Sequence, residues 1–127
     1  MARKLKFKTS LLCDYATEGL YGKPTLVGVY SGDIVLTEMP MQLRLAYFGE
    51  IESTPTTLQI NFLMNGAPFG RLDCESNPDA GPYSIILFPT LDIKIAKPSV
   101  IEIVGTCAGM ADTVLLKSRF ELGSMTR

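Results

Sequence analysis

The chain has 127 residues, of which 46% are hydrophobic and 20% charged, a composition that suits one globular domain with a single core. Its 13 acidic and 12 basic residues nearly cancel, so no overall field would draw it onto nucleic acid or an anionic membrane. It contains no histidine, which removes the commonest general base and metal ligand.

The amino-terminal segment predicts an amphipathic strand over residues 3–12. Leu5, Phe7, Thr9 and Leu11 would share the buried face, and Lys4, Lys6, Lys8 and Ser10 the exposed one. The apolar stretch after the basic residues, Leu11 and Leu12, is too short for a secretion signal, and no apolar run approaches the roughly 20 residues of a membrane span. We therefore expect a cytoplasmic protein without a membrane contact.

The lysines of this strand have two interpretations. Cations at every second residue lie about 7 Å apart, which is close to the phosphate spacing of an extended single strand. Lysine on an exposed edge strand also prevents pairing with other sheets. We favour the second interpretation, because no base-stacking aromatic residue is interleaved on the lysine face and Phe7 would point to the buried one.

The next third of the chain alternates short strands with turns. Residues 14–24 carry Gly19, Gly22 and Pro24 and predict a loop. Extended segments follow over residues 25–30, 34–36 and 41–48, and residues 50–55 form a polar connection.

The clearest local signal is a hairpin over residues 56–73. Leu58, Ile60 and Phe62 alternate with polar residues before Asn65-Gly66, the pair that tolerates the positive φ angles of a type I′ turn. Pro68 predicts that the returning strand lies at a sheet edge or carries a bulge.

The last third predicts three more strands. Residues 83–88 form a solid apolar run, which indicates burial on both faces or under a loop, and residues 100–107 follow. In residues 114–122, Val114, Leu116, Phe120 and Leu122 would face one way and Leu115, Lys117, Arg119 and Glu121 the other. We expect residues 123–127 to form a frayed tail.

These segments predict an all-β fold. No stretch of ten or more residues has a helical period, and strands at intervals of 8 to 15 residues with proline-bearing connections are typical of packed antiparallel sheets. We expect one antiparallel β-sandwich domain of about seven or eight strands over residues 1–122, with a partly open barrel as the alternative.

One pattern in the first third of the chain consists of Leu12, Cys13, Asp14, Tyr15 and Ala16, then Gly22 and Lys23, then Leu26, Val27, Gly28 and Val29, with Pro40 further on. This pattern resembles a family of small, functionally uncharacterised bacterial and phage β-sandwich domains. It implies a β-sandwich of bacterial or phage origin, and it implies no activity and no catalytic residues.

The three cysteines, Cys13, Cys74 and Cys107, are odd in number and widely spaced, which suits free thiols in a reducing compartment. Cys13 lies beside Asp14, where it could act as a nucleophile. A thiolate needs a base or a cationic environment, and no histidine can serve. We therefore interpret Cys13 as a buried, inert thiol.

Several side chains could bind a ligand. Asp14 could anchor a partner or act as a general base, or its carboxylate could cap the loop that follows. The cationic residues that could meet an anion are Lys23, Arg44, Arg71 and Arg119.

A hard cation such as calcium requires clustered oxygen ligands. Asp73, Glu75, Asn77 and Asp79 are spaced by two residues and supply such oxygens. The EF-hand pattern fails, because Pro78 stands where that loop needs glycine and Ser84 where it needs glutamate. A metal site and a solvated acidic loop are the two interpretations, and no cofactor is predicted.

Three functions of different classes remain open. The leading one is a non-catalytic binding or assembly module that contacts a protein partner or another copy of itself through strand edges and loops. The second is a protein that binds or sequesters a small ligand. The third is an enzyme that uses carboxylates such as Asp14 and Glu18, or Asp73 and Glu75, for which the sequence offers only the residues themselves.

Overall fold

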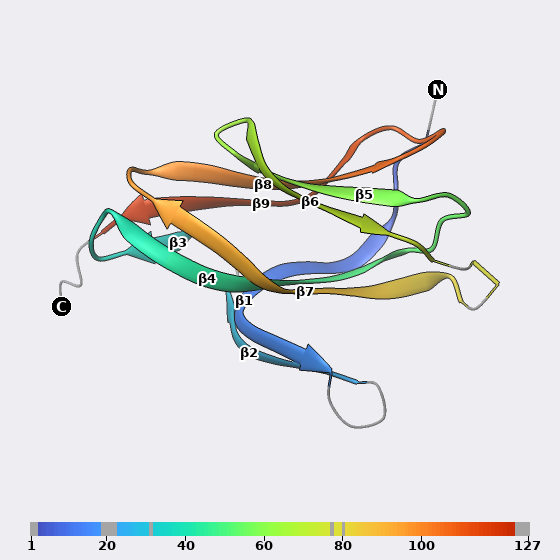
Figure 1. The fold of residues 1–127 in the computed structure, drawn as a ribbon, viewed down its shortest axis with the longest axis horizontal. Coiled ribbons are helices and arrows are strands. Elements are labelled where there is room, and N and C mark those ends of the chain that lie inside the picture. Colours follow the sequence, from blue (N-terminus) through green and yellow to red (C-terminus); the bar gives the residue numbers. More distant parts are fainter. Residues whose placement is uncertain (1–2, 19–22, 31, 77, 80, 124–127) are drawn as a thin grey trace.

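The computed structural model describes residues 3–18, 23–30, 32–76, 78–79 and 81–123. These residues form nine strands and no helix (Figure 1). The strands are β1 (Phe7–Glu18), β2 (Pro24–Tyr30), β3 (Ile34–Leu36), β4 (Met41–Glu52), β5 (Leu58–Met64), β6 (Ala67–Cys74), β7 (Tyr83–Ile95), β8 (Ser99–Cys107) and β9 (Thr113–Leu122). None of the described residues belongs to a helix of the length and apolarity that crossing a membrane requires.

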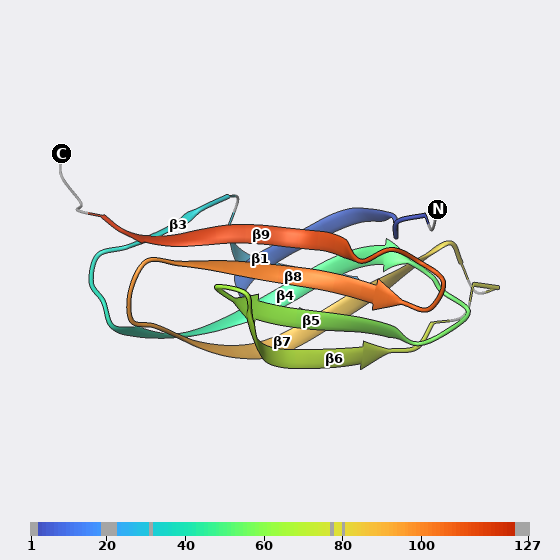
Figure 2. The same cartoon turned by 90° about the horizontal axis from the view of Figure 1, so that it is seen from above.

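The strands form two sheets that pack face to face (Figure 1). One sheet has the strand order β2-β1-β4-β7, and the other has the order β3-β9-β8-β5-β6, which Figure 2 shows from above. All neighbouring strands are antiparallel except β3 and β9, which are parallel. The sheets do not close into one another, so the predicted sandwich is confirmed and the partly open barrel is not formed.

The hydrophobic core lies between the two sheets. In β8, every second residue from Ser99 to Cys107 is buried, as in a strand with one face on the core. Aromatic rings from both sheets meet in the core: Tyr47 stands edge-on to Phe62 at 6.0 Å between ring centroids, and Phe88 lies 5.3 Å from Phe62. One continuous apolar cluster therefore joins the two sheets.

The predicted hairpin is confirmed. Asn65 and Gly66 connect β5 to β6 with φ angles of 51° and 84°. β6 is an edge strand, and its register against β5 shifts at Phe69. Both alternatives predicted from Pro68, an edge position and a bulge, therefore hold.

The predicted faces of the first strand are wrong in part. Leu5 is buried as expected, but Phe7 is 40% exposed, and Leu12 rather than Leu11 enters the core. The register of β1 against β4 shifts at Lys8. An extra residue at this point reverses the faces of the residues that follow it, so Leu12 and not Leu11 faces inward, and the unbroken alternation of the sequence gives no sign of it.

A second bulge changes the faces of β9. Ile103 of β8 pairs with Leu116 and Val104 pairs with Val114, so Leu115 is an extra residue without a partner across the ladder. Leu115 is consequently buried and Val114 exposed, the reverse of the prediction. Beyond the bulge, Phe120 is buried as expected.

Three strands are longer than the sequence predicted. β1 continues to Glu18, within the predicted loop; β4 continues to Glu52, within the predicted polar connection; and β7 continues to Ile95. The added residues pair with a neighbouring strand, which is a tertiary interaction that local patterns do not report.

The apolar run that opens β7 is not buried on both faces throughout. Ile86 points into the core, whereas Ile85 on the opposite face is largely exposed. Leu87 packs instead against a small second apolar cluster outside the sandwich.

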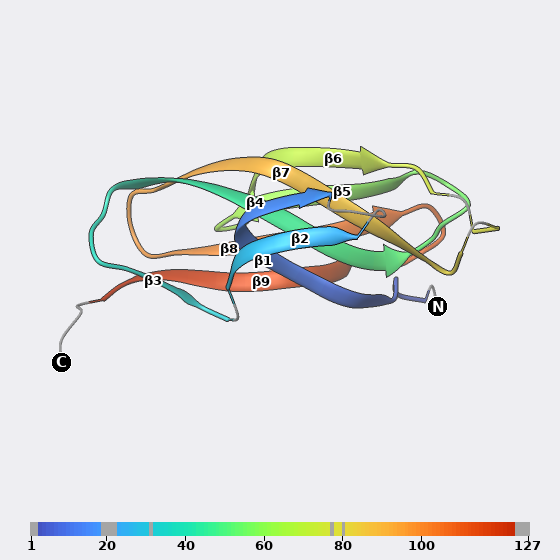
Figure 3. The ribbon, with the colours of Figure 1, turned by 90° about the horizontal axis from the view of Figure 1, so that it is seen from below.

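The far part of the β1–β2 hairpin forms this second cluster. β1 first runs beside β4, then turns sharply, and its second half continues with β2 over the outer face of β4 and β7 (Figures 1 and 3). Ala16 and Leu26 of the hairpin pack against Cys13, Ala46 and Leu87 of the sheet. The hairpin is therefore a partial third layer that covers part of the outer face.

The two sides of the sandwich differ. Where β1 lies near β9, the segment before β1 closes the side: Lys4 bridges to Ala111, and the Leu5 N–H donates to Thr113 Oγ1 at 3.0 Å. On the other side β6 and β7 end their sheets, and no described strand joins them.

The carboxyl end of the described chain is held by a backbone hydrogen bond. The N–H of Gly123 donates to the carbonyl oxygen of Leu36 at 2.9 Å, so Gly123 belongs to the folded part. Residues 124–127, the rest of the predicted tail, lie outside the described residues.

Candidate functional site

Asp14 lies where the β1–β2 hairpin bends. Cys13 pairs with Val29 and Tyr15 pairs with Val27, which places Asp14 across from Gly28. Gly28 has a φ of +68°, and a Cβ at this position would overlap the Asp14 carboxylate. Glycine is therefore required here both by the backbone conformation and by the space that Asp14 occupies.

The Asp14 carboxylate accepts a hydrogen bond from the Tyr30 hydroxyl. This bond, together with partial burial, raises the pKa of Tyr30 to about 12. The sequence suggested that this carboxylate would accept hydrogen bonds from the backbone of the loop that follows. Among the described residues, its donor is instead the Tyr30 side chain. The arrangement ties the two strands of the hairpin together at the bend.

The four cationic candidates lie on different parts of the fold. Lys23 directly precedes β2, Arg44 belongs to β4, Arg71 to β6 and Arg119 to β9. Arg44 pairs with Asp92 at 2.9 Å and Arg71 with Asp73 at 3.3 Å, in both cases on the surface. No hydrogen bond or ion pair within the described chain joins any of the four to another or to Asp14. A common anion site for these residues therefore remains a prediction.

The predicted metal ligands lie along and after β6. Asp73 pairs with Arg71, Glu75 follows the strand, Asp79 lies further along the loop, and Asn77 lies outside the described residues. In the described ranges, no three acidic or cysteine side chains are grouped closely enough to hold a metal ion. The calcium hypothesis is thus left as a prediction.

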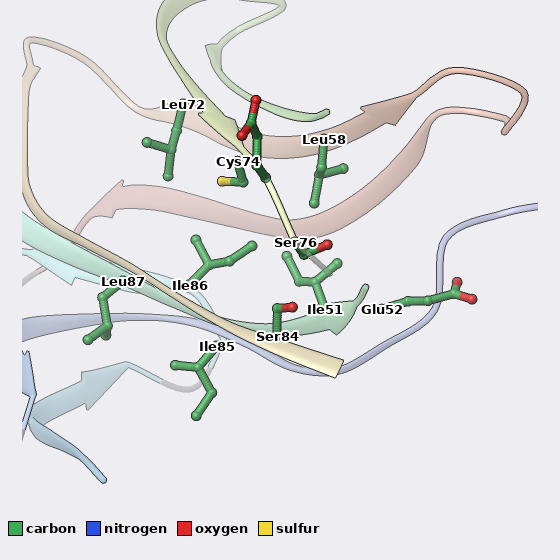
Figure 4. A pocket seen from close by; sticks show the side chains of 11 residues that line it. Ile51, Glu52, Leu58, Leu72, Cys74, Ser76, Ser84, Ile85, Ile86 and Leu87 are labelled. Carbon is green, nitrogen blue, oxygen red and sulfur yellow. The ribbon is translucent and has the colours of Figure 1, made fainter. Parts of the chain in front are cut away.

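A cleft of about 260 Å³ opens where β6 and β7 end their sheets (Figure 4). Leu58 and Leu72 line it from the five-stranded sheet, and Ile51 and Ile86 line it from the four-stranded sheet. Figure 4 shows these side chains converging from the two sheets, while Ile85 points to the far side of β7. The cleft is thus an opening into the hydrophobic core.

Two serines lie at the mouth of the cleft, and both use their hydroxyls within the fold. Ser76 Oγ accepts a hydrogen bond from the Thr54 N–H at 2.9 Å and donates to the Thr54 carbonyl oxygen at 3.3 Å. Ser84 Oγ is 2.8 Å from Ser53 Oγ. Among the described residues, these hydrogen bonds join the serines to Thr54 and Ser53, and no hydrogen bond joins either serine to a carboxylate.

The charged groups of the cleft are carboxylates. Glu52 forms an ion pair with Arg3 at 2.8 Å, and the hydrogen bond from Arg3 lowers the pKa of Glu52. Glu75 also lines the cleft, and it has no ion-pair partner among the described residues. The mouth therefore carries an uncompensated negative charge.

Cys74 also lines the cleft and is half-buried, whereas Cys13 and Cys107 are buried. Burial raises the pKa of the Cys74 thiol, and the neighbouring Asp73 carboxylate raises it further. A nucleophilic cysteine needs the opposite shift. Cys13 is buried, as expected, and burial raises the pKa of its thiol as well, while its inertness stays a prediction.

No protein-family model matches this chain, and no curated protein is significantly similar to it in sequence. The resemblance to bacterial and phage β-sandwich domains therefore stays a prediction.

Sequence reasoning did not identify the cleft. The alternation of Leu72 and Cys74 with Arg71 and Asp73 does indicate which side chains of the hairpin face inward. It does not indicate that β6 and β7 both end their sheets on one side, because that depends on pairing between distant segments.

Proposed function

We propose that the protein is a non-catalytic binding module that takes an apolar side chain of a partner protein into the cleft between β6 and β7. The observation that carries this proposal is an apolar opening into the core, lined by Leu58, Leu72 and Ile86, at the one side of the sandwich that no described strand covers. Burial of an apolar group there would be favourable by about 25 cal/mol per Å² of surface removed from water.

The chemistry of the cleft favours binding over catalysis. Its serines are used by the fold, its thiol has a raised pKa, and one of its two carboxylates is paired with Arg3. Catalysis by any of these groups would require a base or an acid with a matched pKa. The cleft lining supplies no such pair.

The dimensions favour a side chain over a free ligand. Sites for drug-sized ligands measure about 300 to 1,000 Å³ and bury most of the ligand, so a cleft of about 260 Å³ suits one large apolar side chain. The uncompensated charge of Glu75 would favour a lysine or arginine next to the inserted residue.

We also infer a cytoplasmic location for this module. All three cysteines are free thiols, which is the usual state in a reducing compartment.

A selection from a random peptide library tests the proposal. Peptides that bind the wild-type protein should share one apolar anchor, with a basic residue beside it. The Leu72→Arg variant would place a charge in the cleft and should weaken the selected peptides at least tenfold, as measured by fluorescence anisotropy.

The matched control is Leu116→Arg. Leu116, like Leu72, is a half-buried leucine that packs against the core, but it lies on β9, away from the cleft. Peptides should bind this variant as they bind the wild type, and circular dichroism would verify that both variants fold. Equal binding to the wild type and Leu72→Arg, or no peptide selected by the wild type, would overturn the proposal.

A further inference from the structure

The four strands that end the sheets differ in how they are protected from pairing with another chain. β3 has only three residues. β6 contains Pro68, Arg71 and Asp73, and β7 contains Pro89, Asp92 and Lys94. Short strands, prolines and charges all prevent edge-to-edge pairing, so these three edges carry recognised protection.

The fourth edge strand, β2, has a proline only at its first position and has no charged residue. Its sequence from Pro24 to Tyr30 has seven residues and no charge. Proline at the first position of a strand leaves the later N–H groups free to pair. Val27 and Val29 are 53% and 50% exposed, and exposed Tyr15 lies beside Val27 on β1.

We propose that β2 pairs antiparallel with β2 of a second copy, forming a two-fold symmetric dimer. Such a dimer would continue the four-stranded sheet of each copy across the interface and would cover the exposed valines. A second copy fits this edge because the strand itself has no charge, so two copies meet without like-charge repulsion.

The charges at the ends of β2 complement one another in this arrangement. Lys23, which is exposed, precedes the strand, and Asp33, also exposed, follows it. An antiparallel pair brings the start of each strand to the end of the other. Each Lys23 therefore approaches the end of its partner's β2 that precedes Asp33. The Asp33 carboxylate accepts a hydrogen bond from the Arg119 N–H at 3.1 Å, and its charge would still attract Lys23, twice by symmetry.

The bend in the hairpin selects a register. Gly28, with its φ of +68°, lies at the bend and interrupts the regular course of β2. The two bends coincide only when Gly28 of one copy lies opposite Gly28 of the other. That register places Val27 of each copy opposite Val29 of its partner, so the exposed valines cover one another.

The proposed dimer and the proposed binding cleft use different strands. The dimer uses the free edge of β2, whereas the cleft is lined by residues of β4, β5, β6 and β7. The dimer does not depend on the cleft's function, and each can fail without the other. If both hold, one dimer presents two clefts and binds a repetitive partner with avidity.

Analytical ultracentrifugation over a range of concentrations tests the dimer. The wild-type protein should dimerise in the micromolar range, because a pair of short strands buries less surface than a standard interface. Val27→Lys should weaken dimerisation at least tenfold. The matched control is Val114→Lys: Val114 is 51% exposed, close to the value for Val27, and lies on β9, which has a neighbouring strand on both sides, so this variant should dimerise like the wild type.

A cross-linking experiment tests the register and remains informative if a lysine variant fails to fold. Val27→Cys and Val29→Cys are made separately in a Cys74→Ser background, so that the two remaining native cysteines are buried. After mild oxidation, a mixture of the two variants should form disulfide-linked dimers faster than either variant alone. A monomer at all concentrations, an unchanged Val27→Lys dimer, or no preference for the mixture would overturn the proposal.

Discussion

At the scale of single residues, Asp14 and Gly28 fit together because one has a side chain and the other has none. The Asp14 carboxylate occupies the space that a Cβ at position 28 would need, and Tyr30 holds the carboxylate there by its hydroxyl. The single glycine within an apolar strand therefore has a steric cause. It allows the hairpin to bend toward the outer face of the sheet.

The Gly28→Ala variant should lose more stability than an alanine at another glycine of positive φ. Gly109 has a φ of +78°, and no atom lies within 4 Å of the position that a Cβ would take there, so Gly109→Ala should cost only the backbone strain of about 1–2 kcal/mol. Gly28→Ala adds the overlap with Asp14 and should cost about 3 kcal/mol or more. Urea unfolding measures both free energies of unfolding.

The double variant Asp14→Ala/Gly28→Ala separates the two contributions. Without the Asp14 carboxylate only the Asp14 Cβ, 3.0 Å away, still crowds a Cβ at position 28, so the double variant should lose less stability than the sum of the two single variants. Equal costs for Gly28→Ala and Gly109→Ala would contradict the steric account.

Tyr30 and Tyr47 should ionise late and make stability fall at high pH. The hydrogen bond to Asp14 raises the pKa of Tyr30 to about 12, and burial raises that of Tyr47 to about 12, from the usual value of 10.0. Because the folded protein keeps these protons longer than the unfolded chain, their contribution is complete below pH 10 and is lost as the pH rises to about 12. Tyrosinate absorbance during alkaline titration checks both groups. In Tyr30→Phe one late step should disappear, and two remaining steps near pH 12 would argue against the assignment.

At the scale of elements, the turn between β5 and β6 also anchors the hairpin to β8. The Asn65 side chain accepts a hydrogen bond from the Val100 N–H at 2.9 Å and donates one to Ser99 Oγ at 3.3 Å. The same residue adopts a φ of 51°, which asparagine tolerates better than most residues. One side chain thus serves both the turn and the attachment.

Substitutions of Asn65 should follow a fixed order of stability. Asn65→Gly keeps the permitted φ but removes the side-chain hydrogen bonds, at a cost of about 1 kcal/mol. Asn65→Ala also adds backbone strain, about 1–2 kcal/mol more. Thermal unfolding by circular dichroism would rank wild type, glycine and alanine in that order, and an alanine variant as stable as the glycine variant would contradict the role of the turn.

The elements also show which structural features a sequence can predict. The Asn65-Gly66 hairpin is local, so it was predicted correctly from neighbouring residues. The bulges at Lys8 and Leu115 are set by pairing with β4 and β8, and both reversed the predicted faces. The bend at Gly28 also required a distant partner, because the sequence shows the glycine but not the carboxylate beside it.

At the scale of the whole molecule, the fold separates two surfaces. The bent hairpin places the uncharged β2 at one edge of the four-stranded sheet, and β7 at the opposite edge borders the apolar cleft. The all-β sandwich was predicted from composition and spacing, whereas the cleft was not, because it depends on which strands end the sheets. Of the predicted site residues, Glu75 lies at the cleft and Asp14 supports the bend.

Cys74 gives the most direct test of binding in the cleft, because it lines the cleft while the other two thiols are buried. The measurement is the rate of alkylation of each cysteine by iodoacetamide, followed by mass spectrometry, with and without a saturating peptide from the selection. We predict that Cys74 reacts first in the free protein and that the peptide slows its reaction at least tenfold, while the buried Cys13 and Cys107 stay slow in both conditions. An unchanged rate at Cys74 with the peptide bound would contradict the assignment of the cleft as the binding site.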